Sequence, residues 1–325
     1  MTDRSARIDS FLGSAGWADA TRAAMAGDLS ARRYLRLARN GGTAILMDAP
    51  PDKDASTPAF VAMTEWLRGF GLSAPRILAA KPELGLLLLE DLGDLKVSDL
   101  VNAGPSERLE IYDTILDLLL LIRAQSVPAL PCPKPAALVA MTRLADDHYP
   151  GLNTAGILPF RAVLETIFRD LAATAPTVSL RDFHADNLMW LPEREGVARL
   201  GLLDYQDAFL THPVYDLVSL LTDARTDIDP AFRSRMIGLY ADRSGDDPHK
   251  LEVAFAAFSA QRNLRILGIF VRAAKEFGKT GHLAKLPRVY GYFTEALRNP
   301  IFEDVAEETL AAIAPPEVVL AEVLR

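Results

Sequence analysis

Residues 180–188 read LRDFHADNL, and residues 199–204, further along the chain, read RLGLLD. Apolar runs on either side of a polar turn fold back on each other, so these segments predict a β-hairpin. The hairpin would bring Asn187 and Asp204 to the same end, with Asp182 on the loop that leads into it. We therefore expect two carboxylates and an amide oxygen to meet at one place.

Oxygen atoms in this arrangement suit the transfer of a phosphoryl group. Magnesium prefers hard oxygen ligands and keeps positions open for phosphate oxygens, so Asn187 and Asp204 are candidate Mg²⁺ ligands. A carboxylate must also orient the attacking hydroxyl and accept its proton, which makes Asp182 the candidate catalytic base. The competing interpretation is that both aspartates only form turns, but the ordered set of base, amide and second aspartate favours the metal site.

The composition of the chain narrows the class of protein. The chain has 325 residues, of which half are hydrophobic. It carries 35 basic and 43 acidic side chains, which gives a net charge of −8. This balance lacks the basic footprint of a nucleic-acid-binding protein and predicts a sizeable apolar core. The single cysteine, Cys132, can form neither an intrachain disulfide nor a cysteine-based zinc site.

The chain shows no targeting or membrane-spanning segment in its sequence. The first residues lack the apolar centre of a signal peptide, and the most continuous apolar runs, residues 84–89 and 118–122, are far shorter than a membrane span. We therefore expect a cytoplasmic enzyme without a membrane partner. The oligomeric state is left open.

Two parts of the chain differ in their periodicity. Residues 1–92 combine helical segments, the first at about residues 5–25, with short strands, and Asn40-Gly41 predicts a hairpin turn between two of these strands. In the rest of the chain helical periodicity dominates, with a β-like interruption at residues 178–204. We predict an α+β fold with a small antiparallel-sheet lobe, residues 1–92, and a large, mainly helical lobe, residues 93–325.

The catalytic segment resembles that of known kinases. Residues 181–187 match the spacing of the catalytic loop H-R-D-x-x-x-x-N, and Asp204 stands where the metal-binding aspartate of D-F-G follows it. Residues 212–217, HPVYDL, are similar to the D-P-x-Y-D-L motif of the aminoglycoside phosphotransferase family. The resemblance implies a protein-kinase-like two-lobed fold that uses ATP and Mg²⁺. It also implies that His184 could donate to the transferring phosphate and that Asp216 braces the loop.

Further segments resemble bacterial kinases that act on amino sugars of the cell wall. They read DLSARRYLR at 28–36, AILMDAPP at 44–51, LLEDLGD at 88–94, QRNLRILGIF at 261–270 and LPR at 286–288. Kinases of this branch phosphorylate the anomeric hydroxyl of N-acetylmuramate and N-acetylglucosamine during peptidoglycan recycling. The resemblance therefore implies a small amino-sugar acceptor, with an aminoglycoside or another small alcohol as the alternative.

The sequence departs from the kinase pattern at two places. Leu180 replaces the usual histidine of the catalytic loop, which we expect to change packing rather than chemistry. Leu46 or Met47 occupies the position of the lysine that holds the donor phosphates in protein kinases. Arg32 and Arg33 are the candidates for this phosphate-binding role, with an exposed arginine pair as the alternative. The missing lysine also keeps open a pseudokinase that binds nucleotide without turnover.

The hinge of a kinase joins its two lobes and binds adenine through backbone groups. Residues 90–92 follow an apolar strand and precede a glycine, which is where such a hinge belongs. We predict that the Glu90 carbonyl and the Leu92 amide bind adenine. The alternative is a plain strand end.

The acceptor site leaves the weakest pattern in the sequence. N-acetylmuramate carries a lactyl carboxylate, which a bidentate arginine could bind. The candidates are Arg143, Arg262 and Arg265, although charged residues on helices are more often solvated.

Overall fold

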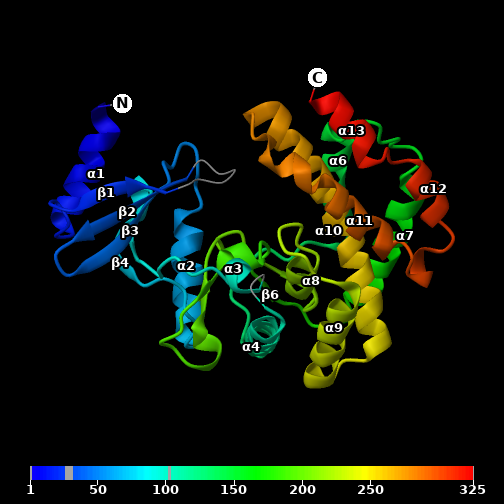
Figure 1. Ribbon diagram of the computed structural model, residues 1–325, viewed down its shortest axis with the longest axis horizontal. Helices are drawn as coiled ribbons and strands as arrows, with labels where there is room; N and C mark the ends of the chain where they lie inside the picture. Colours follow the sequence, from blue (N-terminus) through cyan, green and yellow to red (C-terminus); the bar gives the residue numbers. More distant parts are fainter. Residues whose placement is uncertain (1, 26–31, 102–103, 325) are drawn as a thin grey trace. The chain divides into compact units, whose positions relative to one another are not determined.

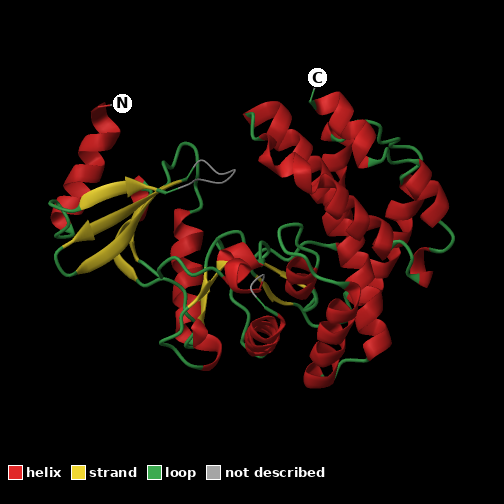
Figure 2. Cartoon of the chain, in the orientation of Figure 1, coloured by secondary structure: helices red, strands yellow, loops and turns green. Residues whose placement is uncertain are grey.

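The computed structural model describes residues 2–25, 32–101 and 104–324, which form two compact units. One unit consists of Met1–Asp99 and Asn187–Ala208, and the other of Leu100–Asp186 and Phe209–Arg325. Strands gather mainly in the first unit, and helices dominate the second (Figure 2). The predicted α+β fold class is confirmed. Residues 28–31, part of one segment that carries the family resemblance, lie outside the described residues.

The first unit is built on an antiparallel sheet. Five strands among the described residues pair in the order β1-β2-β3-β5-β4. Their bounds are β1 Thr21–Ala24, β2 Arg33–Arg39, β3 Gly42–Asp48, β4 Ile77–Lys81 and β5 Leu86–Glu90. The predicted turn joins β2 to β3. Its backbone is tight at Gly41 (φ 106°) and Gly42 (φ 142°), and glycine permits these angles because it has no side chain to clash.

Helix α1, Thr2–Ser14, covers one face of this sheet (Figure 1). Side chains of a strand alternate between its two faces, and most positions of β2, β3 and β5 that face α1 are apolar, whereas Asp48 at the end of β3 pairs with Arg4 of α1. The core of this contact comprises Ile8, Phe11, Leu12, Trp17, Leu37, Ala44, Leu46, Leu86 and Leu88. The predicted helix at residues 5–25 is too long, because α1 ends at Ser14 and Gly16 (φ 74°) turns the chain towards β1.

Strands β7, Leu188–Trp190, and β8, Leu200–Leu202, form the hairpin expected from the sequence. Beyond the paired strands, the Leu203 N–H donates to the Asn187 carbonyl at 3.0 Å. Asn187 and Asp204 therefore lie at the same end of the hairpin.

Backbone hydrogen bonds join this hairpin to the first unit. The Leu202 N–H donates to the Ser73 carbonyl (3.0 Å), and the Trp190 N–H donates to the Leu95 carbonyl (2.8 Å). Residues 187–208 are thus part of the unit that contains the sheet, although they lie beyond the predicted lobe boundary. The assignment of nucleotide binding to one lobe and acceptor binding to the other remains a prediction.

Helix α2, Thr57–Gly69, packs against the segment that follows the hairpin. The Phe60 ring stacks on the Tyr205 ring with centroids 4.9 Å apart. The hydroxyls of Thr64 and Tyr205 are 2.7 Å apart and share a hydrogen bond. Because Tyr205 is fully buried, these contacts fix the chain directly after Asp204.

The second unit is organised around α10, Pro248–Phe277, which contacts α6, α7, α8, α9 and α11. Asp247 caps the start of α10 by accepting from the Lys250 N–H (3.0 Å), and Gly278 (φ 66°) ends the helix. The other helices are α3 Val97–Val101, which begins in the first unit, α4 Pro105–Arg123, α5 Pro135–Ala140, α6 Leu144–His148, α7 Leu158–Leu171, α8 Tyr215–Leu221, α9 Pro230–Ser244, α11 Leu286–Ala296, α12 Ala306–Ala311 and α13 Pro316–Val323. A short antiparallel pair, β6 Thr177–Ser179 and β9 Phe209–Thr211, precedes α8.

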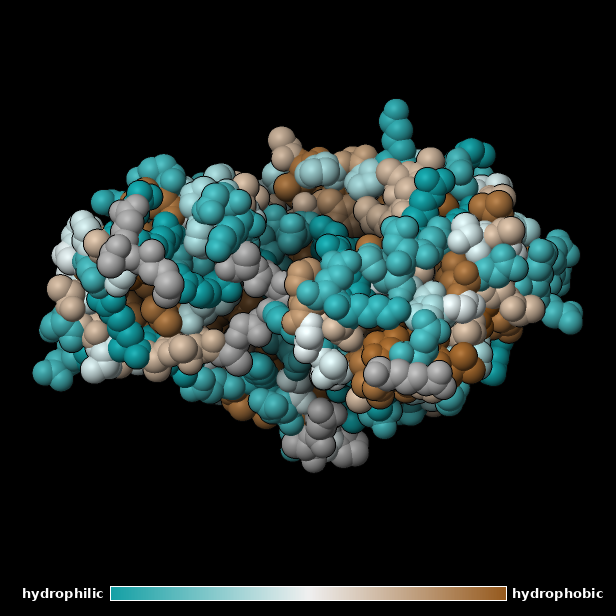
Figure 3. All heavy atoms as spheres, turned by 90° about the horizontal axis from the view of Figure 1, so that it is seen from above, coloured by the Kyte–Doolittle hydropathy of each residue, from teal (hydrophilic) through white to brown (hydrophobic). Residues whose placement is uncertain are grey.

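The surface is mixed in polarity. Hydrophilic side chains occupy much of the face seen in Figure 3, with apolar groups between them. The single cysteine, Cys132, is exposed. Of the helices in the described residues, none has both the length and the apolar character needed to cross a membrane.

Candidate active site

A buried carboxylate fixes the start of the catalytic loop. Asp216 lies on α8 and is 3% exposed. It accepts hydrogen bonds from the Ser179 hydroxyl (2.6 Å), the Leu180 N–H (2.7 Å) and the Arg181 N–H (3.2 Å). Burial raises the pKa of Asp216 to about 6, and these hydrogen bonds oppose that shift because they stabilise the carboxylate. Asp216 therefore braces the loop, as the family resemblance implies.

The backbone is strained at two of the positions that the sequence singles out. Among the residues that the structure describes, only Arg181 (φ 70°) and Asp204 (φ 58°) are left-handed without being glycine. Such a conformation costs about 1–3 kcal/mol and persists only where surrounding contacts impose it. The Arg181 carbonyl accepts from Nη1 of Arg262 (3.0 Å) and from the Ser219 hydroxyl (3.3 Å). Strain of this kind concentrates at functional sites.

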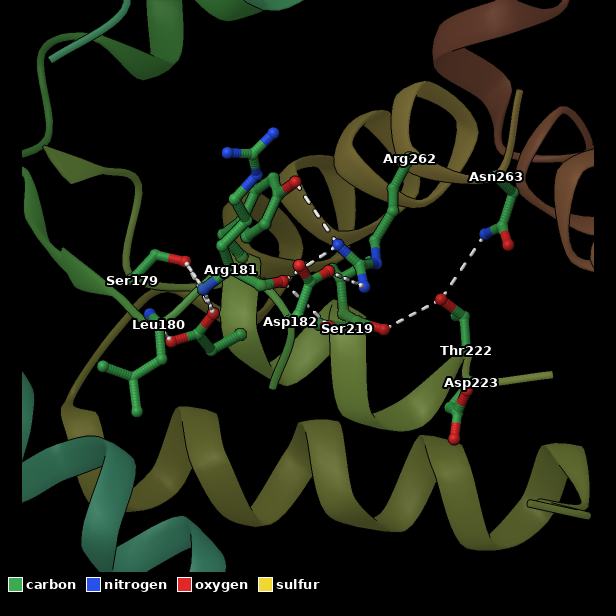
Figure 4. A network of polar contacts seen from close by, with 12 residues as sticks. Ser179, Leu180, Arg181, Asp182, Ser219, Thr222, Asp223, Arg262 and Asn263 are labelled. Carbon is green, nitrogen blue, oxygen red and sulfur yellow. Dashed lines mark hydrogen bonds and ion pairs between the residues drawn. The ribbon is translucent and has the colours of Figure 1, made fainter. Parts of the chain in front are cut away.

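Asp182 follows Arg181, and its side chain is 44% exposed. Nη2 of Arg262 lies 3.7 Å from Oδ1 of Asp182 (Figure 4). Burial on its own would raise the pKa of Asp182, but the positive charges of Arg262 and Arg181 outweigh it and lower the pKa. Asp182 is therefore ionised at neutral pH, which is the state that a general base needs.

His184 is buried two residues beyond Asp182. Its backbone N–H donates to the Asp182 carbonyl at 3.2 Å. Burial lowers the pKa of His184, and the nearby charge of Arg225 lowers it further, so the imidazole is neutral at pH 7. A neutral ring still carries one N–H and can donate one hydrogen bond. Donation to a transferring phosphate remains a prediction.

Asp204 lies in the first unit with its side chain 38% exposed. Its Oδ1 accepts from Nη2 of Arg32 (3.1 Å) and from Nε2 of Gln206 (3.0 Å). Asn187, at the same end of the hairpin, completes the 3₁₀ turn Ala185–Asn187. A partly exposed carboxylate and an amide oxygen fit a Mg²⁺ ion whose remaining positions are taken by phosphate and water. Metal binding by Asn187 and Asp204 remains a prediction.

Arg32 is buried beside Asp204, with 7% of its side chain exposed. Its Nε lies 3.2 Å from Oδ2 of Asp54, while its Nη1 is buried without a hydrogen-bond partner among the described residues. Burial on its own would lower the pKa of Arg32, but Tyr34 and the three carboxylates of Asp204, Asp54 and Asp207 outweigh it and raise the pKa. The guanidinium is therefore charged, and besides its contacts with Asp54, Asp204 and Tyr34 its Nη1 meets no hydrogen-bond acceptor at bonding distance within the described part of the chain.

The two candidates for the position of the kinase lysine, Leu46 and Met47, lie on opposite faces of β3. Leu46 packs into the core under α1, so Met47, the next residue of β3, faces the opposite side of the sheet and is fully buried. Arg33 binds Asp48 on the neighbouring strand. The two arginines predicted for the phosphates thus have different partners, and Arg32 is the one beside Asp204.

Ion pairs fix the segment predicted to be the hinge. The Glu90 carboxylate accepts from Nη2 of Arg194 at 2.9 Å. Nε of Arg36, on β2, lies 2.9 Å from the carboxylate of Asp91. Binding of adenine by the Glu90 carbonyl and the Leu92 amide remains a prediction.

The three arginines predicted for the acceptor lie in different surroundings. Arg143 is exposed. Arg262, on α10, is buried, donates to the Arg181 carbonyl and lies over the Tyr215 ring, 5.7 Å from its centroid. Arg265 is half-buried, three residues further along α10.

Comparison with known proteins decides the family. The sequence model of the APH phosphotransferase enzyme family matches residues 21–253, well over half of the chain. The chain belongs to the APH phosphotransferase family. The resemblance predicted from residues 181–187 and 212–217 is thereby confirmed.

Relatives match the phosphotransferase over nearly its whole length. An N-acetylmuramate/N-acetylglucosamine kinase of Caulobacter vibrioides is 34% identical, and the match covers 94% of this chain and 95% of that protein. A kinase of the same name from Pseudomonas putida is 29% identical, covering 87% of this chain and 86% of that protein. The crystal structure of a choline kinase from Streptococcus pneumoniae has a TM-score of 0.67 at 14% identity, covering 90% of this chain and 99% of that one. That likeness confirms the protein-kinase-like fold.

Sequence reasoning missed how the phosphotransferase holds its catalytic loop. Arg262 was a candidate for the acceptor, yet its guanidinium is engaged by the loop itself. A signal was available, because Arg262 stands four residues after the buried Phe258, on an apolar face of α10 where a charged side chain needs an internal partner. The left-handed backbone of Arg181 had no signal, since residue type predicts such angles mainly for glycine, asparagine and aspartate.

Proposed function

We propose that this phosphotransferase is an ATP- and Mg²⁺-dependent kinase that phosphorylates the anomeric hydroxyl of N-acetylmuramate and N-acetylglucosamine. The choice of acceptor is supported by the near full-length similarity to two kinases of that name. The observation that carries the chemistry is the partly exposed, ionised Asp182 on a loop that Asp216 and Arg262 hold in a strained conformation. Such a kinase would act in cell-wall recycling, in the cytoplasm, where ATP is available.

Asp182 is the general base in this proposal. Its lowered pKa keeps the carboxylate ionised, so it can accept a hydrogen bond from the anomeric hydroxyl and then its proton as phosphorus is attacked. The braced loop keeps the carboxylate in place and so reduces the entropic cost of reaching the reactive geometry. His184, which is neutral, donates a hydrogen bond to the transferring phosphoryl group.

The donor nucleotide is bound by residues of the first unit. Asn187 and Asp204 hold Mg²⁺, which neutralises phosphate charge during the transfer. Arg32 takes the place of the missing lysine, because its guanidinium is charged, buried and equipped with a spare donor, whereas Met47 is apolar. The Glu90 carbonyl and the Leu92 amide bind adenine. In this proposal residues 1–92 form the nucleotide-binding lobe and residues 93–325 the acceptor-binding lobe.

A substrate panel tests the proposal. The purified chain is incubated with ATP, Mg²⁺ and one acceptor at a time: N-acetylmuramate, N-acetylglucosamine or kanamycin. We expect ADP release with both amino sugars and a phosphorus NMR signal of an anomeric phosphate in each product. ADP release with kanamycin alone would favour an aminoglycoside kinase.

A pseudokinase is the second candidate function, and the apolar residue at the lysine position, Leu46 or Met47, favours it. A thermal-shift measurement with ATP and Mg²⁺ separates the two functions when it is combined with the same panel. Stabilisation by nucleotide without ADP release for any acceptor would identify the pseudokinase and contradict the kinase.

A further inference from the structure

Three arginines gather around the catalytic loop. Arg181 belongs to the loop, while Arg262 and Arg265 lie three residues apart on α10 and therefore on the same face of that helix. The charges of all three act on the Asp182 carboxylate. The second carboxylate of the cluster, Asp216, is buried and occupied by the Ser179 hydroxyl and backbone N–H groups. Positive charge therefore exceeds negative charge at this place.

Arg262 is already engaged by the protein. Its Nη1 donates to the Arg181 carbonyl at 3.0 Å and its Nη2 lies 3.7 Å from the Asp182 carboxylate (Figure 4). Its guanidinium also lies over the Tyr215 ring. A guanidinium with these contacts is 6% exposed and has little surface left for a ligand.

Arg265 has no such contacts. It forms no ion pair or hydrogen bond with any residue in the described part of the chain. Burial lowers the pKa of Arg265, and the positive charges of Arg181 and Arg262 lower it further, while Tyr215 and Asp182 only partly oppose this shift. A half-buried guanidinium without a counter-ion is costly, and an anion that binds there would remove the cost.

We propose that Arg265 binds the carboxylate of N-acetylmuramate and thereby sets the preference between the two amino sugars. The inference rests on the proposed function. N-acetylmuramate carries its carboxylate on a lactyl ether of the same ring whose anomeric hydroxyl faces Asp182, and N-acetylglucosamine has a plain hydroxyl in place of that ether. An arginine fork matches a carboxylate with two parallel hydrogen bonds.

The test compares both sugars on one variant, so that general damage cancels. In Arg265→Gln the ratio of kcat/KM for N-acetylmuramate to kcat/KM for N-acetylglucosamine should fall by about 10- to 100-fold, mainly through KM, because a charge-assisted hydrogen bond is lost. Arg272→Gln, an exposed arginine of the same helix, should leave the ratio unchanged. An equal loss on both sugars, or a changed ratio in Arg143→Gln instead, would overturn the assignment.

A second experiment changes the substrate and is read first on the wild-type enzyme. The methyl ester of N-acetylmuramate removes the charge of the acid and adds a single methyl group, so the wild-type enzyme should use the ester about 10- to 100-fold less well than the acid. Arg265→Gln should use both forms equally. Equal use of acid and ester by the wild type would overturn the inference while the kinase function stands. No turnover of either sugar by the wild type would overturn the proposed function, and the inference with it.

Discussion

Two aspartates of this phosphotransferase each have a buried arginine beside them, but the arginines act on different atoms. At Asp182, Arg262 donates to the Arg181 carbonyl and stays 3.7 Å from the carboxylate. At Asp204, Arg32 contacts the carboxylate itself, at 3.1 Å. The first arginine fixes the backbone next to an aspartate, and the second compensates the charge of an aspartate.

The difference matches the two proposed roles. A general base must be held in place with an oxygen left open to the acceptor hydroxyl, so its arginine acts through the backbone. A metal ligand carries a charge that some cation must balance, and at Asp204 this cation is a side chain with a spare donor. A bound ion at Asp204 would take over that balance and leave Arg32 to the phosphates.

The largest expected effect is a loss of kcat when Asp182, the proposed base, is replaced. Asp182→Asn should lower kcat by about 10²- to 10⁴-fold while KM for the amino sugar changes little, because asparagine keeps the shape but cannot accept the proton. An ADP-release assay with N-acetylglucosamine measures it. Asp170→Asn, an exposed change on α7, serves as the control. Turnover of Asp182→Asn within a few-fold of the wild type would remove Asp182 from the role of base.

A smaller effect, on KM for ATP, is expected when Arg32, the arginine beside Asp204, is replaced. Arg32→Gln should raise KM for ATP by about 10- to 100-fold, because a charged hydrogen-bond donor to phosphate is lost. The same assay on Arg33→Gln tests the neighbouring candidate, whose side chain binds Asp48. If Arg33→Gln raised KM for ATP more than Arg32→Gln did, the assignment of the phosphate contact would be reversed.

Replacing Arg262, which holds the catalytic loop, should shift the pH dependence of kcat. Arg262 is the strongest of the charges that lower the pKa of Asp182, so Arg262→Gln should raise that pKa. Asp182 would then be protonated at higher pH, and the acidic limb of the kcat profile would move to higher pH. Melting temperatures check that the variant is folded, and Arg272→Gln should leave the limb in place. A uniform loss of kcat at every pH would restrict Arg262 to positioning the loop.

The smallest expected effect comes from Ser219, which shares the Arg181 carbonyl with Arg262 and so allows the two contacts to be compared. The Ser219 hydroxyl is 3.3 Å from the Arg181 carbonyl, so Ser219→Ala removes only a long, neutral hydrogen bond. We expect the free energy of unfolding, measured with urea, to fall by about 1 kcal/mol or less, with kcat nearly unchanged. A larger loss of kcat than in Arg262→Gln would mean that Ser219 is the main brace.

The parts of the site that could be predicted from the sequence are encoded locally. The hairpin that brings Asn187 and Asp204 together follows from two short apolar runs and a turn, and its strands pair as expected. The long helix α10 has its start and end signals in the residues next to it, Asp247 and Gly278. Local signals failed after Ser14, where Gly16 (φ 74°) turns the chain and a strand replaces the expected helix.

The parts that could not be predicted depend on residues far apart in the chain. Arg262 reaches a carbonyl 81 residues away, and Arg32 reaches a carboxylate 172 residues away. Periodicity places a residue on the face of an element but does not reveal which distant group it meets there. Family resemblance supplied the role of Asp216, but the arginine partners became visible only in the folded chain.

The left-handed backbone at Asp204 has a consequence for how such proteins change over time. Glycine would adopt φ 58° without strain, yet it would remove both the oxygen atoms proposed to hold the metal and the carboxylate that pairs with the buried Arg32. Relief of backbone strain alone would therefore favour glycine here, whereas turnover and the pairing of Arg32 favour aspartate. The residue at this position in a related chain would tell whether that chain has remained under selection as a catalyst.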